Sequence, residues 1–219
     1  MLIVSIEGNI GSGKSTLINK LKKEFTSVGM TPVIYIDEPV KVWNTIMDEN
    51  GDNIIKKYYE DQQKYAFQFQ MMAYITRITE LRKAMDKYNG ECIIITERSI
   101  ETDKEVFAKM LYETKTLDTI SYTIYLKWFE ELCRDLKVSE LIYLKTAPET
   151  ALERVVKRNR PGETIPIEYL RDCHDRHERW LQNRKGVLLL NGERDIDESF
   201  GAKLFTIKTA VEGWNNYQH

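Results

Sequence analysis

A glycine-rich segment near the amino end carries the clearest chemistry in the sequence. It reads Gly-Asn-Ile-Gly-Ser-Gly-Lys-Ser-Thr from Gly8 to Thr16 and matches the spacing G-x-x-x-x-G-K-[ST]. An apolar run precedes it, and apolar residues at helical spacing follow it. Glycines let backbone N–H groups surround phosphate oxygens, Lys14 can reach the terminal phosphates, and the Ser15 hydroxyl can bind Mg²⁺. We therefore predict a site for a nucleoside triphosphate and Mg²⁺, formed by Gly8, Asn9, Ile10, Gly11, Ser12, Gly13, Lys14, Ser15 and Thr16.

Two carboxylates follow two other apolar runs. Glu38 comes after the run from Val33 to Ile36, and Glu97 comes after the run from Cys92 to Thr96. Ligands of parallel sheets bind beyond the carboxyl ends of the strands, so both side chains should face the glycine-rich loop. One carboxylate there can accept a proton from a hydroxyl group, and the other can hold Mg²⁺ or its waters. The alternative is that these loops are simply acidic.

Three arginines lie close together further along the chain. Arg154 and Arg158 are four residues apart and share a face of an expected helix, and Arg160 precedes Pro161-Gly162, which should end that helix. We expect an arginine-rich lid at about 154–165 that closes over the phosphates and neutralises their charge. A solvated basic end of a helix is the alternative.

The order of elements predicts the fold that positions these groups. Short β-branched runs at 2–6, 33–36, 92–96, 140–144 and 187–190 alternate with longer amphipathic segments, which is typical of βαβ units. Helices are expected near 14–28, 40–48, 54–88, 103–112, 118–136, 148–157, 166–184 and 198–214. The sequence thus predicts one α/β domain over 1–219, a P-loop NTPase-like three-layer α/β/α fold with a five-stranded parallel sheet.

Composition excludes several classes of protein. A net charge of −2 provides no long-range attraction to nucleic acid polymers or anionic membranes, and 42% hydrophobic residues are enough for a core. No apolar run approaches the length of about 20 residues that a membrane helix needs. The N-terminus lacks the features of a secretory signal, and the three cysteines are scattered, so we expect a cytoplasmic protein.

Several further blocks accompany the glycine-rich loop in a characteristic order. They are Glu38-Pro39-Val40-x-x-Trp43, Phe67-x-Phe69-Gln70, Glu97-Arg98-Ser99, Ile165-Pro166-x-Glu168-Tyr169-Leu170 and His174-x-x-His177-Glu178-x-Trp180-Leu181. Together with the loop they resemble the deoxynucleoside kinases that act on deoxycytidine, deoxyguanosine, deoxyadenosine and thymidine. The resemblance spans residue 2 to about residue 190. It implies transfer of the γ-phosphate of ATP, with Mg²⁺, to the 5′-hydroxyl of a deoxynucleoside in nucleotide salvage, and it implies a homodimer.

The resemblance also implies roles for individual residues. Glu38 matches the base that acts on the 5′-hydroxyl, Arg98 the arginine that steadies it, and Glu97 the partner of Mg²⁺-bound water. Tyr59 and Glu163 match the pair that binds the 3′-hydroxyl. The remaining matches form the walls and floor of the nucleoside pocket: Trp43, Phe69 and Phe107 as aromatic walls and Gln70 as the amide that reads the base.

Three residues bear on the choice of base. Ala73 and Arg77 lie three and seven residues after Gln70, so all three share one helix face, and Asp103 follows the third strand. By resemblance, an arginine with an aspartate here marks the branch acting on deoxycytidine and purine deoxynucleosides. A carboxylate can accept a hydrogen bond from the exocyclic amine of a base. Thymine presents a carbonyl oxygen instead, which would leave the carboxylate without a hydrogen-bond donor. The alternative is a structural ion pair behind the pocket.

Some features depart from the family, and other classes of enzyme remain as alternatives. The lid is about one residue shorter than in the animal enzymes, and 191–199, where adenine should bind, matches poorly. A nucleoside monophosphate kinase shares the loop and the arginines, but Glu38 would repel a phosphate acceptor. A GTPase switch is less well supported, since the sequence has no guanine-reading [NT]-K-x-D after a strand.

Overall fold

Five parallel strands form the centre of the protein in a computed structural model that describes residues 1–89, 91–160, 162–182 and 184–217. Their order across the sheet is β3 (Thr31–Ile36), β4 (Ile93–Glu97), β1 (Leu2–Glu7), β5 (Glu140–Lys145) and β6 (Val187–Asn191). All neighbouring pairs among these five are parallel. The predicted five-stranded parallel sheet is confirmed.

A sixth strand corrects the sequence prediction. The helix expected over 14–28 is shorter, because α1 (Lys14–Glu24) ends before the buried Phe25. The chain then forms β2 (Ser27–Val28) and turns at Gly29, whose φ is 57°, to pair antiparallel with β3. Glycine adopts such a positive φ without the clash of a side chain, so a hairpin replaces the last turns of the expected helix.

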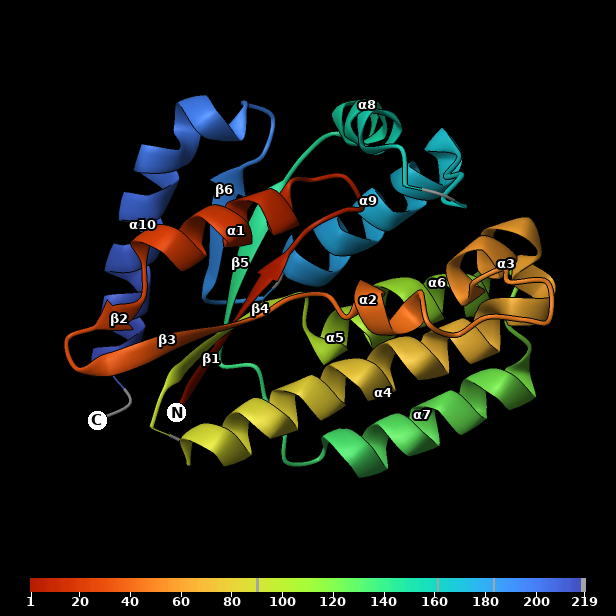
Figure 1. Ribbon diagram of the computed structural model, residues 1–219, viewed down its shortest axis with the longest axis horizontal. Coiled ribbons are helices and arrows are strands. Elements are labelled where there is room, and N and C mark those ends of the chain that lie inside the picture. The colour runs from red at the N-terminus through yellow and green to blue at the C-terminus, as the bar shows by residue number, and fades with distance from the viewer. Residues whose placement is uncertain (90, 161, 183, 218–219) are drawn as a thin grey trace.

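Helices cover both faces of the sheet, as Figure 1 shows. On one face, α1 and α10 (Ile196–Asn216) pack against alternate strand residues such as Val4 and Ile6. On the other face lie α4 (Gln62–Tyr88), α7 (Thr119–Cys133) and α9 (Ile167–Gln182), which pack against Ile3 and Ile94. Apolar burial on both faces explains why the strands read as continuous apolar runs.

The long helix expected over 54–88 is two helices. Asp61 breaks it with φ −147° and ψ 84°, and its carboxylate accepts a hydrogen bond from the backbone N–H of Lys64. Aspartate is a favoured N-cap, which explains why a new helix begins here. The break lets α3 (Ile54–Glu60) pack against α4, with Ile54 and Ile55 in one cluster with Ala73.

The helix expected over 103–112 differs in type. It consists of α5 (Ile100–Thr102), a π-helical segment η1 (Asp103–Ala108) and α6 (Lys109–Glu113). The wider turn of a π-helix is rare, and it is frequently found at functional sites. The segment over 40–48 is also shorter than expected, as α2 (Val40–Trp43), whereas α8 (Pro148–Arg158) agrees with the prediction within one residue.

Within the described residues, we find no helix that is both long enough and apolar enough to cross a bilayer.

Candidate active site

The glycine-rich loop from Gly8 to Thr16 follows β1, and its last three residues form the first turn of α1, as predicted. Gly8, Gly11 and Gly13 have φ values of 147°, 79° and 98°. A Cβ atom on Gly11 would clash with the carbonyl oxygen of Ala151, and one on Gly8 would lie 2.7 Å from the carbonyl oxygen of Leu144. Glycine is therefore required at these two positions both by backbone conformation and by space.

Lys14 lies inside this loop. Its side chain is almost fully buried, and its Nζ donates to the carbonyl oxygens of Asn9 at 2.7 Å and Gly8 at 3.1 Å. Burial lowers the pKa of Lys14 to about 7, and the nearby Arg98 acts in the same direction against the attraction of Glu97. A triphosphate would provide the anionic partner that favours the charged form of this lysine.

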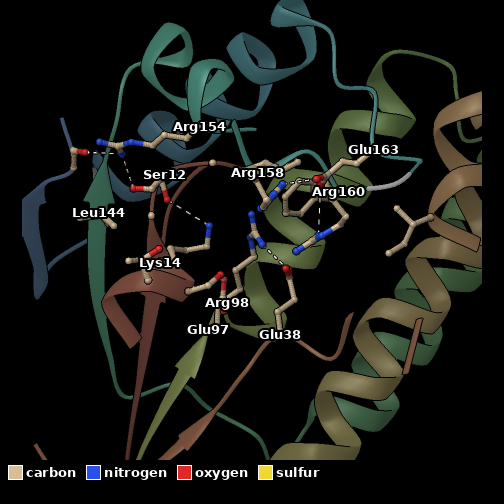
Figure 2. Close-up of a pocket in the computed structure, with 18 of the residues that line it drawn as sticks. Ser12, Lys14, Glu38, Glu97, Arg98, Leu144, Arg154, Arg158, Arg160 and Glu163 are labelled. Atoms are coloured by element: carbon tan, nitrogen blue, oxygen red, sulfur yellow. Dashed lines mark hydrogen bonds and ion pairs between the residues drawn. The ribbon is translucent and has the colours of Figure 1, made fainter. Parts of the chain in front are cut away.

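Glu38, at the carboxyl end of β3, is held by two arginines. Its Oε1 lies 2.5 Å from Nη1 of Arg98 and 3.7 Å from Nη2 of Arg77. Burial opposes the charge on Glu38, but attraction by Arg98 and then Arg77 outweighs it and lowers the pKa to about 2. Figure 2 shows Glu38 and Arg98 pointing toward one another across the cavity.

Arg98 has a strained backbone. Its φ is 63°, which is uncommon for a residue with a side chain, and its N–H donates to the carbonyl oxygen of Ile6 on β1. The guanidinium lies 5.3 Å from the centre of the Phe107 ring. Strain of this kind persists where surrounding contacts hold it, and such sites are often functional.

Glu97 and Ser15 form a second contact between a strand end and the loop. The Ser15 hydroxyl donates to Oε1 of Glu97 at 2.6 Å, and Glu97 is almost fully buried. Hydroxyl and carboxylate oxygens are ligands that Mg²⁺ accepts directly or through its waters, so this pair fits a magnesium ion bound beside a triphosphate.

The three lid arginines separate into two groups. Arg158 and Arg160 both form ion pairs with Glu163. Nη2 of Arg158 lies 2.5 Å from its Oε2, and Nη1 of Arg160 lies 3.5 Å from its Oε1. Arg154 instead donates to the carbonyl oxygens of Gly192 at 2.8 Å and Ser12 at 3.2 Å (Figure 2). Arg154 therefore lies over the loop, away from the other two. Pro161, which we expected to end the helix, lies outside the described residues.

One cavity of about 510 Å³ joins the loop to the predicted pocket. The side of the loop from Ile10 to Thr16 lines it, whereas Gly8 and Asn9 are buried and contact Lys14 through their carbonyl oxygens. The three lid arginines and every residue predicted to bind substrate also line it: Glu38, Trp43, Tyr59, Phe69, Gln70, Ala73, Arg77, Arg98, Asp103, Phe107 and Glu163.

The end of the cavity away from the loop is apolar, with a few polar groups. The rings of Trp43 and Phe69 pack edge to face, with their centroids 5.5 Å apart. Oε1 of Gln70 is buried and has no hydrogen-bond partner among the described residues. Nε of Arg77 lies 3.0 Å from Oδ2 of Asp103. Burial opposes the charge on Arg77, but attraction by Asp103 outweighs it and raises its pKa. An unpaired amide beside a buried ion pair suits a ligand with several hydrogen-bonding atoms.

Comparison with known proteins agrees with the family resemblance seen in the sequence. A sequence profile described as deoxynucleoside kinase matches residues 4–212. The chain belongs to the deoxynucleoside kinase family. A probable deoxycytidine kinase of fowlpox virus (strain NVSL) is 38% identical over 207 aligned positions, and the match covers 90% of this chain and 81% of the relative.

Two animal relatives of this deoxynucleoside kinase agree with that assignment. Deoxycytidine kinase of Homo sapiens is 34% identical over 204 aligned positions, and the match covers 83% of this chain and 75% of the relative. Mitochondrial deoxyguanosine kinase of Xenopus laevis is 32% identical over 229 aligned positions, and the match covers 91% of this chain and 84% of the relative.

Sequence reasoning missed one buried carboxylate of this kinase. Glu7, at the end of β1, accepts hydrogen bonds from the backbone N–H of Ser99 at 2.9 Å, from the Thr102 hydroxyl, and from the Ser5 hydroxyl at 2.5 Å. It thereby ties β1 to the turn that carries Arg98. An acidic residue at the end of an apolar strand was the only signal in the sequence.

Sequence reasoning also missed part of the cavity wall. Tyr58 and Tyr169 line the cavity, and their hydroxyl groups lie 3.0 Å apart. Arg194 and Lys203 line it as well. Tyr169 belongs to the block from Ile165 to Leu170 but was given no role there, and Tyr58, Arg194 and Lys203 lie outside the motifs. Helix periodicity does not distinguish a core position, such as that of Tyr58, from a position on a cavity.

The lowered pKa of Lys14 predicts how triphosphate binding depends on pH. Below pH 7 the ammonium is charged, and its charge is lost as pH rises through 7, so the binding of ATP without nucleoside should weaken about tenfold or more between pH 7 and pH 9. Isothermal titration calorimetry in buffers of different ionisation enthalpy should detect proton uptake at pH 8.

A Lys14→Arg variant is the control, because arginine keeps its charge over this range. Its ATP affinity, although weaker, should be nearly independent of pH. A wild-type affinity that is constant from pH 7 to pH 9, with no proton uptake, would contradict the lowered pKa.

Proposed function

We propose that this deoxynucleoside kinase transfers the γ-phosphoryl group of ATP or another nucleoside triphosphate to the 5′-hydroxyl of deoxycytidine or a purine deoxynucleoside. One observation carries the proposal: Glu38, held by Arg98, shares a cavity with the phosphate-binding loop. In the reaction the hydroxyl oxygen bonds to the γ-phosphorus, its proton passes to Glu38, and the bond between the γ-phosphorus and the bridging oxygen breaks to release the diphosphate.

Cations on several elements would stabilise the charge that develops during transfer. Lys14 would bind the β- and γ-phosphates, while Arg98, Arg158 and Arg160 would neutralise the equatorial oxygens of the transferred group. Arg154 would act on the donor side, because it already contacts the loop and Gly192. Mg²⁺, held through Ser15 and by Glu97 through water, would reduce repulsion between the phosphates.

The apolar end of the cavity would hold the deoxynucleoside. Trp43, Phe69 and Phe107 offer apolar surfaces to the base and sugar, and Ala73 leaves room beside them. Tyr59 and Glu163 would bind the 3′-hydroxyl, and the unpaired amide oxygen of Gln70 would accept from the base.

The ion pair of Arg77 and Asp103 supports the proposed base preference. The buried carboxylate can accept a hydrogen bond from the exocyclic amine of cytosine or adenine, whereas thymine would place a carbonyl oxygen against it. The names of the relatives, deoxycytidine kinase and deoxyguanosine kinase, point to the same group of bases.

A nucleoside monophosphate kinase is the rival from a neighbouring class of enzyme. The anionic Glu38, with its pKa of about 2, would repel a phosphate acceptor at neutral pH. Incubation with γ-labelled ATP and a panel of nucleosides and monophosphates distinguishes the two. Label transferred to deoxynucleosides and not to monophosphates supports the proposal, and the reverse contradicts it.

Replacement of Glu38 tests its role as the base. Glu38→Gln should lower kcat by roughly 10² to 10⁴ while nucleoside binding changes little, because the amide keeps the shape but cannot accept the proton. Asp37→Asn is the matched control: Asp37 is the preceding residue and forms an exposed ion pair with Lys22. The control should retain wild-type kcat, and a kcat of Glu38→Gln within about threefold of wild type would exclude the base role.

Replacement of the Arg77 and Asp103 pair tests the base preference. Thymidine should be a poor substrate of the wild type, and the Arg77→Met, Asp103→Ala double variant should accept it with a kcat/KM raised about tenfold or more relative to deoxycytidine. Both residues are changed together, since Arg77→Met alone leaves a buried carboxylate unpaired at a cost of about 3–5 kcal/mol. If the wild type prefers thymidine to the other three deoxynucleosides, this reading of the pocket is wrong.

An exposed apolar stripe on α7 supports a homodimer. Ile120, Ile124 and Trp128 follow a helical spacing of four and are 74%, 39% and 50% exposed, and α7 packs beside α4 (Figure 1). Light scattering should give about twice the chain mass of 25.8 kDa. Trp128→Glu should shift that mass to the monomer, whereas Phe205→Glu on α10, also at an exposed apolar residue, should not. A monomeric wild type at micromolar concentration would refute the dimer.

The cytoplasmic location remains a prediction from the sequence.

A further inference from the structure

A buried tyrosine on α3 lies in the wall of the cavity. Tyr58 is 1% exposed and lines the cavity together with Tyr59 and Phe69. Its ring also belongs to one apolar cluster with Leu111 and Leu117. The side chain therefore stands between the packed core and the cavity, where its position affects the shape of the pocket.

The ring of Tyr58 contacts two residues of the proposed nucleoside site. It stacks on the Phe69 ring, with the centroids 4.5 Å apart and the planes at 15°. It also meets the Tyr59 ring edge to face, with the centroids 5.2 Å apart. Contacts of both kinds are favourable arrangements of aromatic rings. The position of Tyr58 therefore constrains an expected wall of the base site and an expected partner of the 3′-hydroxyl.

A hydrogen bond to another helix holds the polar end of Tyr58. Its hydroxyl lies 3.0 Å from the hydroxyl of Tyr169 on α9, and either oxygen can be the donor. Burial raises the pKa of both tyrosines, so both hydroxyls stay protonated at neutral pH. The Tyr169 ring also packs edge to face against Tyr59, with the centroids 6.5 Å apart. Tyr58, Tyr59 and Tyr169 thus form a closed set of contacts that joins α3 to α9.

We propose that Tyr58 is a specificity-determining residue: held by Tyr169, it limits the width of the base site and favours the single ring of a pyrimidine over the two rings of a purine. The inference rests on the proposed function, because it requires the base to lie beside Phe69. A large side chain that is held at its ring and at its hydroxyl moves aside for a larger base only at a cost. Deoxycytidine is therefore preferred to the purine deoxynucleosides.

A shorter side chain at position 58 tests the size limit. Tyr58→Leu keeps an apolar side chain in the cluster with Leu111 and Leu117 but removes the phenol from the wall. With ATP as the donor, the ratio of kcat/KM for deoxyguanosine to that for deoxycytidine should be below one in wild type. It should rise about tenfold in the variant, because the purine gains space. An unchanged ratio would overturn the size limit.

Removal of the hydroxyls tests the hydrogen bond without shortening either ring. Tyr58→Phe and Tyr169→Phe should each raise the KM for deoxycytidine about threefold, the effect of one hydrogen bond, while kcat changes less. A single bond joins the two hydroxyls, so the double variant should match either single variant. Effects that simply multiply in the double variant would overturn the role of the bond.

Tyr143→Phe is the matched control. Tyr143 lies on β5, is 4% exposed and is not among the described residues that line the cavity. Its hydroxyl donates to Oε1 of Glu178 at 2.7 Å, so the variant also loses one hydrogen bond of a buried tyrosine. It should leave the KM for deoxycytidine and the substrate ratio at wild-type values. A change as large as that in Tyr58→Phe would indicate general loosening of the fold and overturn the proposal.

A binding measurement separates this inference from the proposed function. Isothermal titration calorimetry without ATP should show that the wild type binds deoxycytidine more tightly than deoxyguanosine. The ratio of the two affinities should fall about tenfold in Tyr58→Leu, whether or not phosphoryl transfer occurs. Equal affinity ratios in wild type and variant would overturn the role of Tyr58. Failure of every deoxynucleoside to accept the phosphoryl group of ATP would instead overturn the proposed function.

Discussion

Mutual compensation of buried charges is the constraint on which the rest of this structure depends. Among the described residues that line the cavity, Lys14, Arg77 and Arg98 are each only 4% exposed, and the charge of each would be costly alone. Carboxylates at the ends of strands and at the start of η1 offset them: Glu7, Glu38, Glu97 and Asp103. As a result, the pKa of Lys14 is lowered and Glu38 is ionised. The cavity therefore suits an anion beside Lys14 and a hydroxyl group that gives up its proton beside Glu38.

The parallel sheet makes this arrangement possible. Parallel strands end at one edge, so β1, β3 and β4 deliver the loop, Glu38 and the turn with Arg98 to neighbouring positions. Glu7 locks two of these strand ends together through Ser99 and Thr102. The positive φ of Arg98 is maintained by this lock and by its backbone bond to β1. The distance between Arg98 and Glu38 is therefore set by short connections, one and two residues long, from the ends of β4 and β3.

The walls of the cavity depend on two departures from regular helices. The break at Asp61 lets α3 pack on α4, which brings Tyr59 to the same cavity as Gln70. The π-helical η1 presents both Asp103 and Phe107 to that cavity, one beside Arg77 and the other against Arg98. The first irregularity has a local physical cause, the aspartate N-cap, and both irregularities add side chains to the pocket.

The sequence by itself determined the glycine-rich loop between β1 and α1, the five parallel strands and the carboxylates that follow them, because each depends on residue types at short spacing and on the period of local hydrophobicity. Family resemblance added the pocket residues, and all of them line one cavity. Only the tertiary structure decided that Arg154 contacts Gly192 and lies apart from Arg158 and Arg160. It also decided that Glu7 joins two strand ends and that Lys203 lies on the cavity and not in the core. Each of those outcomes depends on contacts between segments far apart in the chain, and local periodicity carries no information about such contacts.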